Sequence, residues 1–203
     1  MKTLPSTLTP EAIITDFHPV GSRSRELLLR HGERVGRKAL EILDRAPWLA
    51  ADREFVIASA MLHDVGIGQT HCPDLGCTGR LPYVCHGVAG RRILDELGLQ
   101  RHALVCERHV GVGISAEQAQ RQCAALPARD MLPLSLEERL ICYADKFFSK
   151  TDNGRHEKTP AEIIAGLMRY DADGANRFLA LQRLFSTAPD VPAASVDTIT
   201  APV

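Results

Sequence analysis

Histidine and aspartate residues interrupt several otherwise apolar helical patterns in this sequence. His31 lies among leucines and valines, and His63 and Asp64 end the apolar stretch that begins at Phe55. Asp145 lies inside the segment "RLICYADKFF". An ionised carboxylate surrounded by apolar side chains costs several kcal/mol unless it is paired or binds a metal. These residue types and positions therefore predict a buried cation site.

Asp64 carries a second electrostatic penalty. It ends the helix predicted from about Asp52, and the helix macrodipole disfavours negative charge at a C-terminus. A nearby divalent cation removes both penalties, although an arginine from another helix is an alternative partner for Asp145. His86 is predicted to begin a helix and His109 to end one, so two further imidazoles lie at helix termini.

The elements that position these side chains are predicted to be helices. Apolar residues recur at i, i+3 and i+4 and strand-like alternation is absent, which predicts an all-α bundle. Helix starts are indicated at Thr9-Pro10, Ser135 and Thr159, and Gly98 and Gly111 mark helix ends. The other predicted helices cover about 23–43, 52–64, 86–97, 100–110 and 175–185, and the helix that starts at Ser135 is predicted to reach about Lys150.

One segment differs from this pattern. Residues Gly66 to Cys85 are rich in glycine and show little periodicity, which favours a functional lid or pocket wall. The segment contains His71, Cys72 and Cys77, and together with Cys85 these residues offer an alternative structural zinc site. The spacing of these cysteines differs from the paired Cys-x2-Cys motifs of zinc knuckles, so a pocket-lining loop is the preferred interpretation.

The composition indicates a folded soluble protein of one domain. The chain has 203 residues, 45% hydrophobic and 24% charged, with a formal net charge of −1. This balance gives no basic field for nucleic acid, and no apolar run approaches the roughly 18 residues that span a membrane. The N-terminus lacks the apolar core of a signal peptide. We therefore expect a cytoplasmic protein with neither nucleic acid nor membrane as partner, whose six cysteines form no disulfides.

The order His31, His63-Asp64, Asp145 resembles the HD superfamily of metal-dependent phosphohydrolases. "MLHDVGIG" resembles its signature, and "YADKF" resembles the late helix that supplies the final aspartate. "HGVAGRRIL" and "ERHVGVG" resemble the extra histidine segments of two-metal members. The resemblance implies an all-α HD-domain helical bundle. We expect an N-terminal arm with a short helix (1–22), the HD core (23–152), C-terminal helices packed on the same domain (153–185) and a flexible tail (186–203).

The resemblance also implies a ligand set and a set of catalytic residues. One or two divalent transition-metal ions are implied: the first would be held by His31, His63, Asp64 and Asp145, and a second by His86 and His109 with Asp64 bridging, while a single-metal site is the alternative. Imidazole and carboxylate ligands suit Fe, Mn, Co, Ni or Zn. Arg108 and Lys146 each adjoin a ligand and are candidate contacts for a substrate phosphate. The predicted catalytic residues are therefore Asp64, Arg108 and Lys146.

The implied activity is cleavage of a phosphoester by a metal-activated hydroxide, as a phosphomonoesterase or a phosphodiesterase. The expected substrate is a small phosphorylated compound, with a nucleotide preferred. Ile67, Arg108 and the segment "GVGIS" depart from the HD-GYP pattern, which disfavours cyclic-di-GMP hydrolysis. The alternatives are a dinucleotide polyphosphate hydrolase of the diadenosine-tetraphosphate type, a non-catalytic nucleotide-sensing HD domain and an HD-type di-iron oxygenase.

Overall fold

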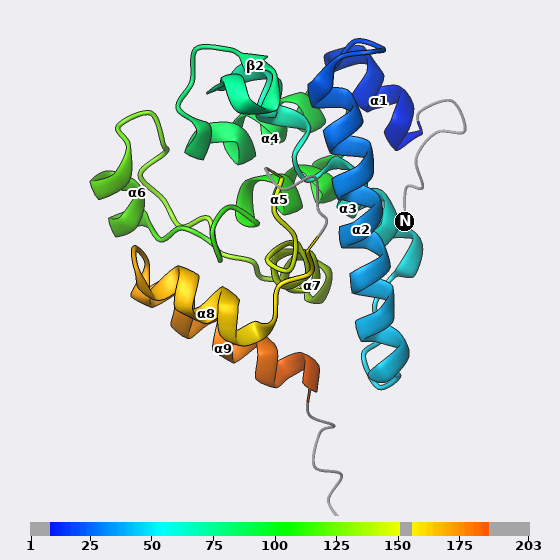
Figure 1. Cartoon of the computed structure of the whole chain (residues 1–203), viewed down its shortest axis with the longest axis vertical. Helices are drawn as coiled ribbons and strands as arrows, with labels where there is room; N and C mark the ends of the chain where they lie inside the picture. Colours follow the sequence, from blue (N-terminus) through cyan, green and yellow to red (C-terminus); the bar gives the residue numbers. More distant parts are fainter. Residues whose placement is uncertain (1–8, 151–155, 187–203) are drawn as a thin grey trace, which may run out of the picture.

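The computed structural model describes residues 9–150 and 156–186, which form a bundle of helices (Figure 1). The long helix α2 (Arg23–Arg45) runs along one side of the bundle, with α1 (Pro10–Phe17) near its N-terminal end. The other α-helices are α3 (Arg53–Leu62), α4 (His86–Glu96), α5 (Gln100–Arg108), α6 (Ala116–Gln122), α7 (Leu136–Asp145), α8 (Pro160–Met168) and α9 (Ala172–Ser186). The predicted all-α class is confirmed.

The glycine-rich segment between α3 and α4 holds short elements that the sequence pattern did not indicate. It contains the 3-10 helices η1 (Val65–Gln69), η2 (Pro73–Leu75) and η3 (Tyr83–Cys85). Between them, strands β1 (His71–Cys72) and β2 (Cys77–Thr78) pair antiparallel, with Cys72 opposite Cys77. Gly76 has a φ of 75° at the turn between these strands, a conformation that glycine adopts without steric cost. Two-residue strands are too short to produce a visible alternation of residue types.

Local capping signals set the helix starts. The Thr9 hydroxyl accepts a hydrogen bond from the Ala12 amide, and Thr159 and Glu162 form a reciprocal capping box. At Ser135 only half of the expected box forms. The Ser135 hydroxyl accepts from the Glu138 amide, but the Glu138 carboxylate accepts from the Leu134 amide instead of the cap residue.

Within the described residues three hydrophobic clusters support the bundle, and the two largest join most of its helices. The first joins α2, α3 and α7 to α8 and α9, and it includes Val35, Ile141 and Phe178. The second joins α1, the N-terminal half of α2 and the region around η1, α4 and α5. Helix α2 contributes side chains to both clusters, so it holds the two halves of the bundle at a fixed separation. None of the helices within 9–150 and 156–186 is long and apolar enough to cross a membrane.

The structure differs from the predicted helices at one boundary and in one additional helix. The helix that starts at Ser135 ends at Asp145 rather than near Lys150, because the chain turns there and Phe147 packs into the first hydrophobic cluster. Helix α6 was not predicted, since its seven residues are too few to show a helical period. The tail predicted to be flexible lies outside the described residues from 187 onward.

His102 on α5 provides a test of stability against pH. Burial and, to a smaller extent, Arg101 lower the pKa of His102 to about 4, and the ring packs against Phe55 at 4.6 Å between centroids. The unfolded chain takes up a proton below about pH 6.5 and the folded protein does not, so stability is complete above pH 6.5 and falls as the pH drops towards 4. In urea unfolding with EDTA present, we expect His102→Gln to flatten this decline by about 1 to 3 kcal/mol. Equal slopes of the free energy of unfolding against pH for variant and parent would contradict the assignment of this decline to His102.

Candidate metal centre

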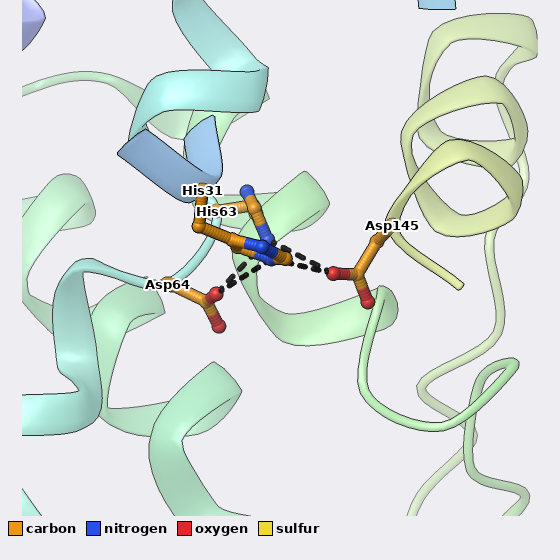
Figure 2. Close-up of side chains that lie close together, drawn as sticks. All are labelled: His31, His63, Asp64 and Asp145. Atoms are coloured by element: carbon orange, nitrogen blue, oxygen red, sulfur yellow. Dashed lines mark hydrogen bonds and ion pairs between the residues drawn. The ribbon is translucent and has the colours of Figure 1, made fainter. Parts of the chain in front are cut away.

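Four predicted ligands from three separate helical elements meet in the middle of the bundle (Figure 2). His31 lies within α2, His63 and Asp64 follow the last residue of α3, and Asp145 ends α7. The His31 Nε2 atom lies 2.8 Å from Asp145 Oδ1 and 3.5 Å from Asp64 Oδ2. His63 Nε2 lies 3.0 Å from Asp64 Oδ2 and 3.5 Å from Asp145 Oδ1. All four side chains are buried.

A second group shares the carboxylate of Asp64. His86, the first residue of α4, and His109, which follows α5, each place Nε2 3.3 Å from Asp64 Oδ1. The two oxygens of one carboxylate therefore point to different groups, Oδ2 to the first and Oδ1 to the second. In each group, one candidate ligand atom from every member lies within 4.8 Å of all the others. This is the arrangement of a carboxylate that can bridge two cations.

The three histidines at helix ends have the same orientation. Nδ1 lies 2.6 Å from the Ala60 carbonyl in His63, 2.6 Å from the Tyr83 carbonyl in His86 and 2.7 Å from the Cys106 carbonyl in His109. A carbonyl oxygen only accepts, so Nδ1 carries the proton and donates it in each case. This tautomer leaves the Nε2 lone pair directed at the centre, as a metal-binding imidazole requires.

The Nε2 atoms of His86 and His109 lie only 3.2 Å apart. With both Nδ1 atoms protonated, two neutral rings would direct lone pairs at each other, which is repulsive unless a proton or a metal ion lies between them. A proton is disfavoured on His109, because burial lowers its pKa to about 3. In addition, His63 Nε2 and Asp64 Oδ1 are buried without a hydrogen bond of acceptable geometry to any described residue. These side chains fit a divalent cation.

Without a cation the charges of the first group must be balanced by protons and lysines. Burial lowers the pKa of His63, but the carboxylates of Asp64 and Asp145 raise it to about 9. Burial raises the pKa of Asp64, but His63 and Lys150 hold it well below its usual range. Lys146 and Lys150 likewise hold the pKa of Asp145 well below its usual range, against the effect of burial. Metal binding would therefore displace a proton from His63.

The two predicted phosphate contacts have partners in the structure. Arg108 pairs with Glu138, with 2.8 Å between Nη1 and Oε2, and its side chain is 17% exposed. Lys146 Nζ lies 2.7 Å from Asp145 Oδ2, the oxygen that makes no ion pair with His31 or His63. Lys146 is thus adjacent to the centre, whereas Arg108 is held towards the start of α7. Their roles in binding substrate stay predictions.

Sequence reasoning missed Lys150. Its Nζ lies 2.8 Å from Asp64 Oδ2, although it was assigned only to the end of a predicted helix. The chain turns after Asp145 and brings Lys150 back to the centre, which no helical period indicates. The available signal was a lysine that follows two phenylalanines in "DKFFSK", since an ammonium drawn into an apolar interior needs a carboxylate partner.

The cysteines in the described ranges do not form the alternative zinc site. Cys85 Sγ lies 4.0 Å from Cys123 Sγ, on the α6 side of the molecule, while Cys72 and Cys77 face each other across β1 and β2. All six cysteines are free thiols, as predicted. Among the described residues, the possible metal-binding groups consist only of the six histidines and aspartates described above.

Comparisons with known proteins agree with this geometry. A family model described as HD domain matches residues 28–149, a range that contains all six side chains. Among solved structures, the fold is similar to that of the HD domain of the L. monocytogenes phosphodiesterase PgpH in complex with cyclic-di-AMP. The TM-score is 0.51 with 16% sequence identity, and the match covers 92% of each chain. At this identity the likeness concerns the fold alone.

Three curated relatives match this chain over part of their length. The chain is 34% identical over 125 residues to a tRNA (cytidine(56)-2'-O)-methyltransferase of Picrophilus torridus. The matched residues cover 61% of this chain and 32% of that protein. It is 31% identical over 164 residues to the protein of the same name in Thermoplasma volcanium, covering 80% of this chain and 43% of that one. It is 39% identical over 101 residues to an uncharacterized protein of Methanocaldococcus jannaschii, covering 49% and 52%. The chain thus spans about a third to half of the length of these relatives.

Proposed function

The chain belongs to the HD-domain family, and we propose that it is a metal-dependent phosphohydrolase acting on a phosphoester of a small phosphorylated compound, preferably a nucleotide. The resemblance noted in the sequence is thereby confirmed at the level of the family. One observation carries the proposal: the Asp64 carboxylate directs Oδ2 to His31 and His63, and Oδ1 to His86 and His109. A carboxylate shared in this way suits two cations a few ångströms apart.

The residues of the centre have distinct tasks in this reaction. Bound divalent cations supply the Lewis acidity that acidifies water and polarises a phosphoryl group. The four histidines provide neutral nitrogen ligands, three of them fixed by hydrogen bonds to carbonyls at the ends of their own helical turns. Asp64 and Asp145 provide the negative charge that retains the cations. Lys146 neutralises Asp145 Oδ2, so Asp145 Oδ1 stays directed at His31.

One structural neighbour supports a nucleotide as the substrate. The PgpH domain of similar fold is a phosphodiesterase in complex with cyclic-di-AMP. A dinucleotide polyphosphate is the alternative substrate. Methyl transfer is not proposed, because the match covers only 32% and 43% of the two relatives named as methyltransferases. A nucleotide-sensing domain without turnover and a di-iron oxygenase are the alternatives outside phosphohydrolysis.

A metal and substrate panel tests the proposal. The metal-free protein is loaded with Mn²⁺, Fe²⁺, Co²⁺, Ni²⁺ or Zn²⁺, and each form is assayed with p-nitrophenyl phosphate, bis-p-nitrophenyl phosphate, nucleoside monophosphates, cyclic dinucleotides and diadenosine tetraphosphate. We expect phosphoester cleavage that EDTA abolishes and metal restores. Tight nucleotide binding without turnover would replace the proposal by the sensing domain, and oxygen consumption by the ferrous protein would replace it by the oxygenase.

Arg108 is tested separately, because its ion pair with Glu138 gives it a structural role as well. If Arg108 also contacts substrate phosphate, we expect Arg108→Ala to raise KM about tenfold or more with little change in kcat. Glu138→Gln breaks the same ion pair but leaves the guanidinium in place, so it should lower stability without raising KM. Equal KM values for Arg108→Ala and the parent would remove Arg108 from the substrate site.

A further inference from the structure

Lys150 is a partly buried cation whose ammonium contacts the candidate metal centre. Its side chain is 14% exposed and its Nζ lies 2.8 Å from Asp64 Oδ2. The same oxygen lies 3.0 Å from His63 Nε2 and 3.5 Å from His31 Nε2. The ammonium therefore contacts the carboxylate oxygen that faces the first group of ligands, and it competes with any cation that these ligands bind.

Lys146 pairs with its aspartate in a different way. Its Nζ contacts Asp145 Oδ2, whereas Asp145 Oδ1 is the oxygen that faces His31. Lys146 can keep this contact when a cation binds, because the two use different oxygens of the carboxylate. Lys150, in contrast, contacts Asp64 Oδ2, the same oxygen that faces the first group of ligands. When the first group is filled, its ammonium must give up all or part of its contact with Asp64.

Tyr83 holds Lys150 on the side of the second group. The phenol of Tyr83 lies close enough to Lys150 for the two groups to interact electrostatically, and its ring stacks on His86, with 4.7 Å between ring centroids. The ammonium thus lies within reach of both groups of ligands. If both groups held a cation, a phosphoryl group that the two cations polarise would lie near Asp64, within reach of the same ammonium.

The charges favour an anion as the next partner of Lys150. Two divalent cations, Lys146 and Lys150 would together carry six positive charges, against two negative charges on Asp64 and Asp145 and one on a metal-bound hydroxide, a net charge of about +3. A buried ammonium beside such an excess is costly unless an anion reaches it. We propose that Lys150 is a substrate-binding residue, which rests on Asp64 in the metal-free protein and donates to a non-bridging phosphoryl oxygen when cations and substrate are bound. This inference rests on the proposed function.

Binding of Mn²⁺ and of inorganic phosphate tests the proposal without turnover. Lys150→Met keeps the length of the side chain and removes its charge, Lys150→Arg keeps the charge, and Lys158→Met alters a lysine on the segment that precedes α8. We expect Lys150→Met to bind Mn²⁺ at least as tightly as the parent, because a competitor for Asp64 is gone. Calorimetry should show its Mn²⁺-loaded form binding inorganic phosphate about 10- to 100-fold more weakly. Lys150→Arg and Lys158→Met should bind phosphate within about threefold of the parent.

Two results would overturn the role of Lys150. Phosphate affinity equal to that of the parent would make Lys150 a counter-charge of Asp64 only. A loss of Mn²⁺ affinity in Lys150→Met would make it a structural part of the centre. If the parent cleaves phosphoesters and Lys150→Met does so with the same kcat/KM, only this inference fails. A parent that neither binds phosphate nor cleaves any phosphoester refutes both the inference and the proposed function.

Discussion

Asp64→Ala is expected to lower the cation content of the purified protein from about two equivalents per chain to well below one, and to lower kcat/KM at least about a thousandfold. Of the residues that the structure describes, Asp64 alone belongs to both groups of ligands. Its removal leaves the first group with a single carboxylate and the second with two imidazoles that face each other at 3.2 Å. Elemental analysis and the phosphoester assay measure the two effects.

Two further variants separate the loss of a ligand from damage to the fold. Asp64→Asn keeps the shape of the side chain but removes its charge, so it should also lose the cations. Asp173→Ala removes an exposed carboxylate in the first turn of α9 and should retain both cations and activity. EDTA should lower the Tm of the parent and leave that of Asp64→Ala nearly unchanged, since only the parent is stabilised by bound metal. Retention of two cations by Asp64→Ala would refute the bridging role.

Gly66→Ala is expected to destabilise the protein by about 3 kcal/mol or more and to disrupt the second group of ligands. Gly66 lies in η1, two residues after Asp64, where η1 packs against α4. A Cβ atom at Gly66 would lie 2.2 Å from both the Gly90 nitrogen and the His86 carbonyl oxygen. These are backbone atoms, which no side-chain rotation can move aside. The substitution must push α4 away, and His86 with it.

Gly166→Ala is the matched control for this substitution. Gly166 lies within α8, and a Cβ atom there meets nothing within 4 Å. Alanine in a helix is favoured over glycine by about 0.5–1 kcal/mol, so this variant should be slightly more stable than the parent. Urea unfolding gives both changes, and metal analysis shows whether the second cation is lost. A Gly66→Ala protein with parental stability and cation content would contradict the close packing of η1 on α4.

The sequence by itself determined the helical class and the ligand types. Apolar spacing and the capping residues Thr9 and Thr159 act over a few residues, and the structure keeps these helix starts. The buried histidines and aspartates were recognisable because a charge in an apolar segment requires a partner. Their order along the chain led to the HD superfamily, and the family match contains them all.

Only the tertiary structure decided how these residues meet. The assignment of Asp64 Oδ1 and Oδ2 to different groups, the contact of Lys150 with Asp64 and the pairing of Arg108 with Glu138 all join segments distant in sequence. Helix α6 and the short strands β1 and β2 also escaped prediction, because they contain too few residues to show a period. Periodicity and capping depend on neighbours a few positions away. His31 and Asp145 are 114 positions apart in the sequence, and they meet because α2 packs against α7.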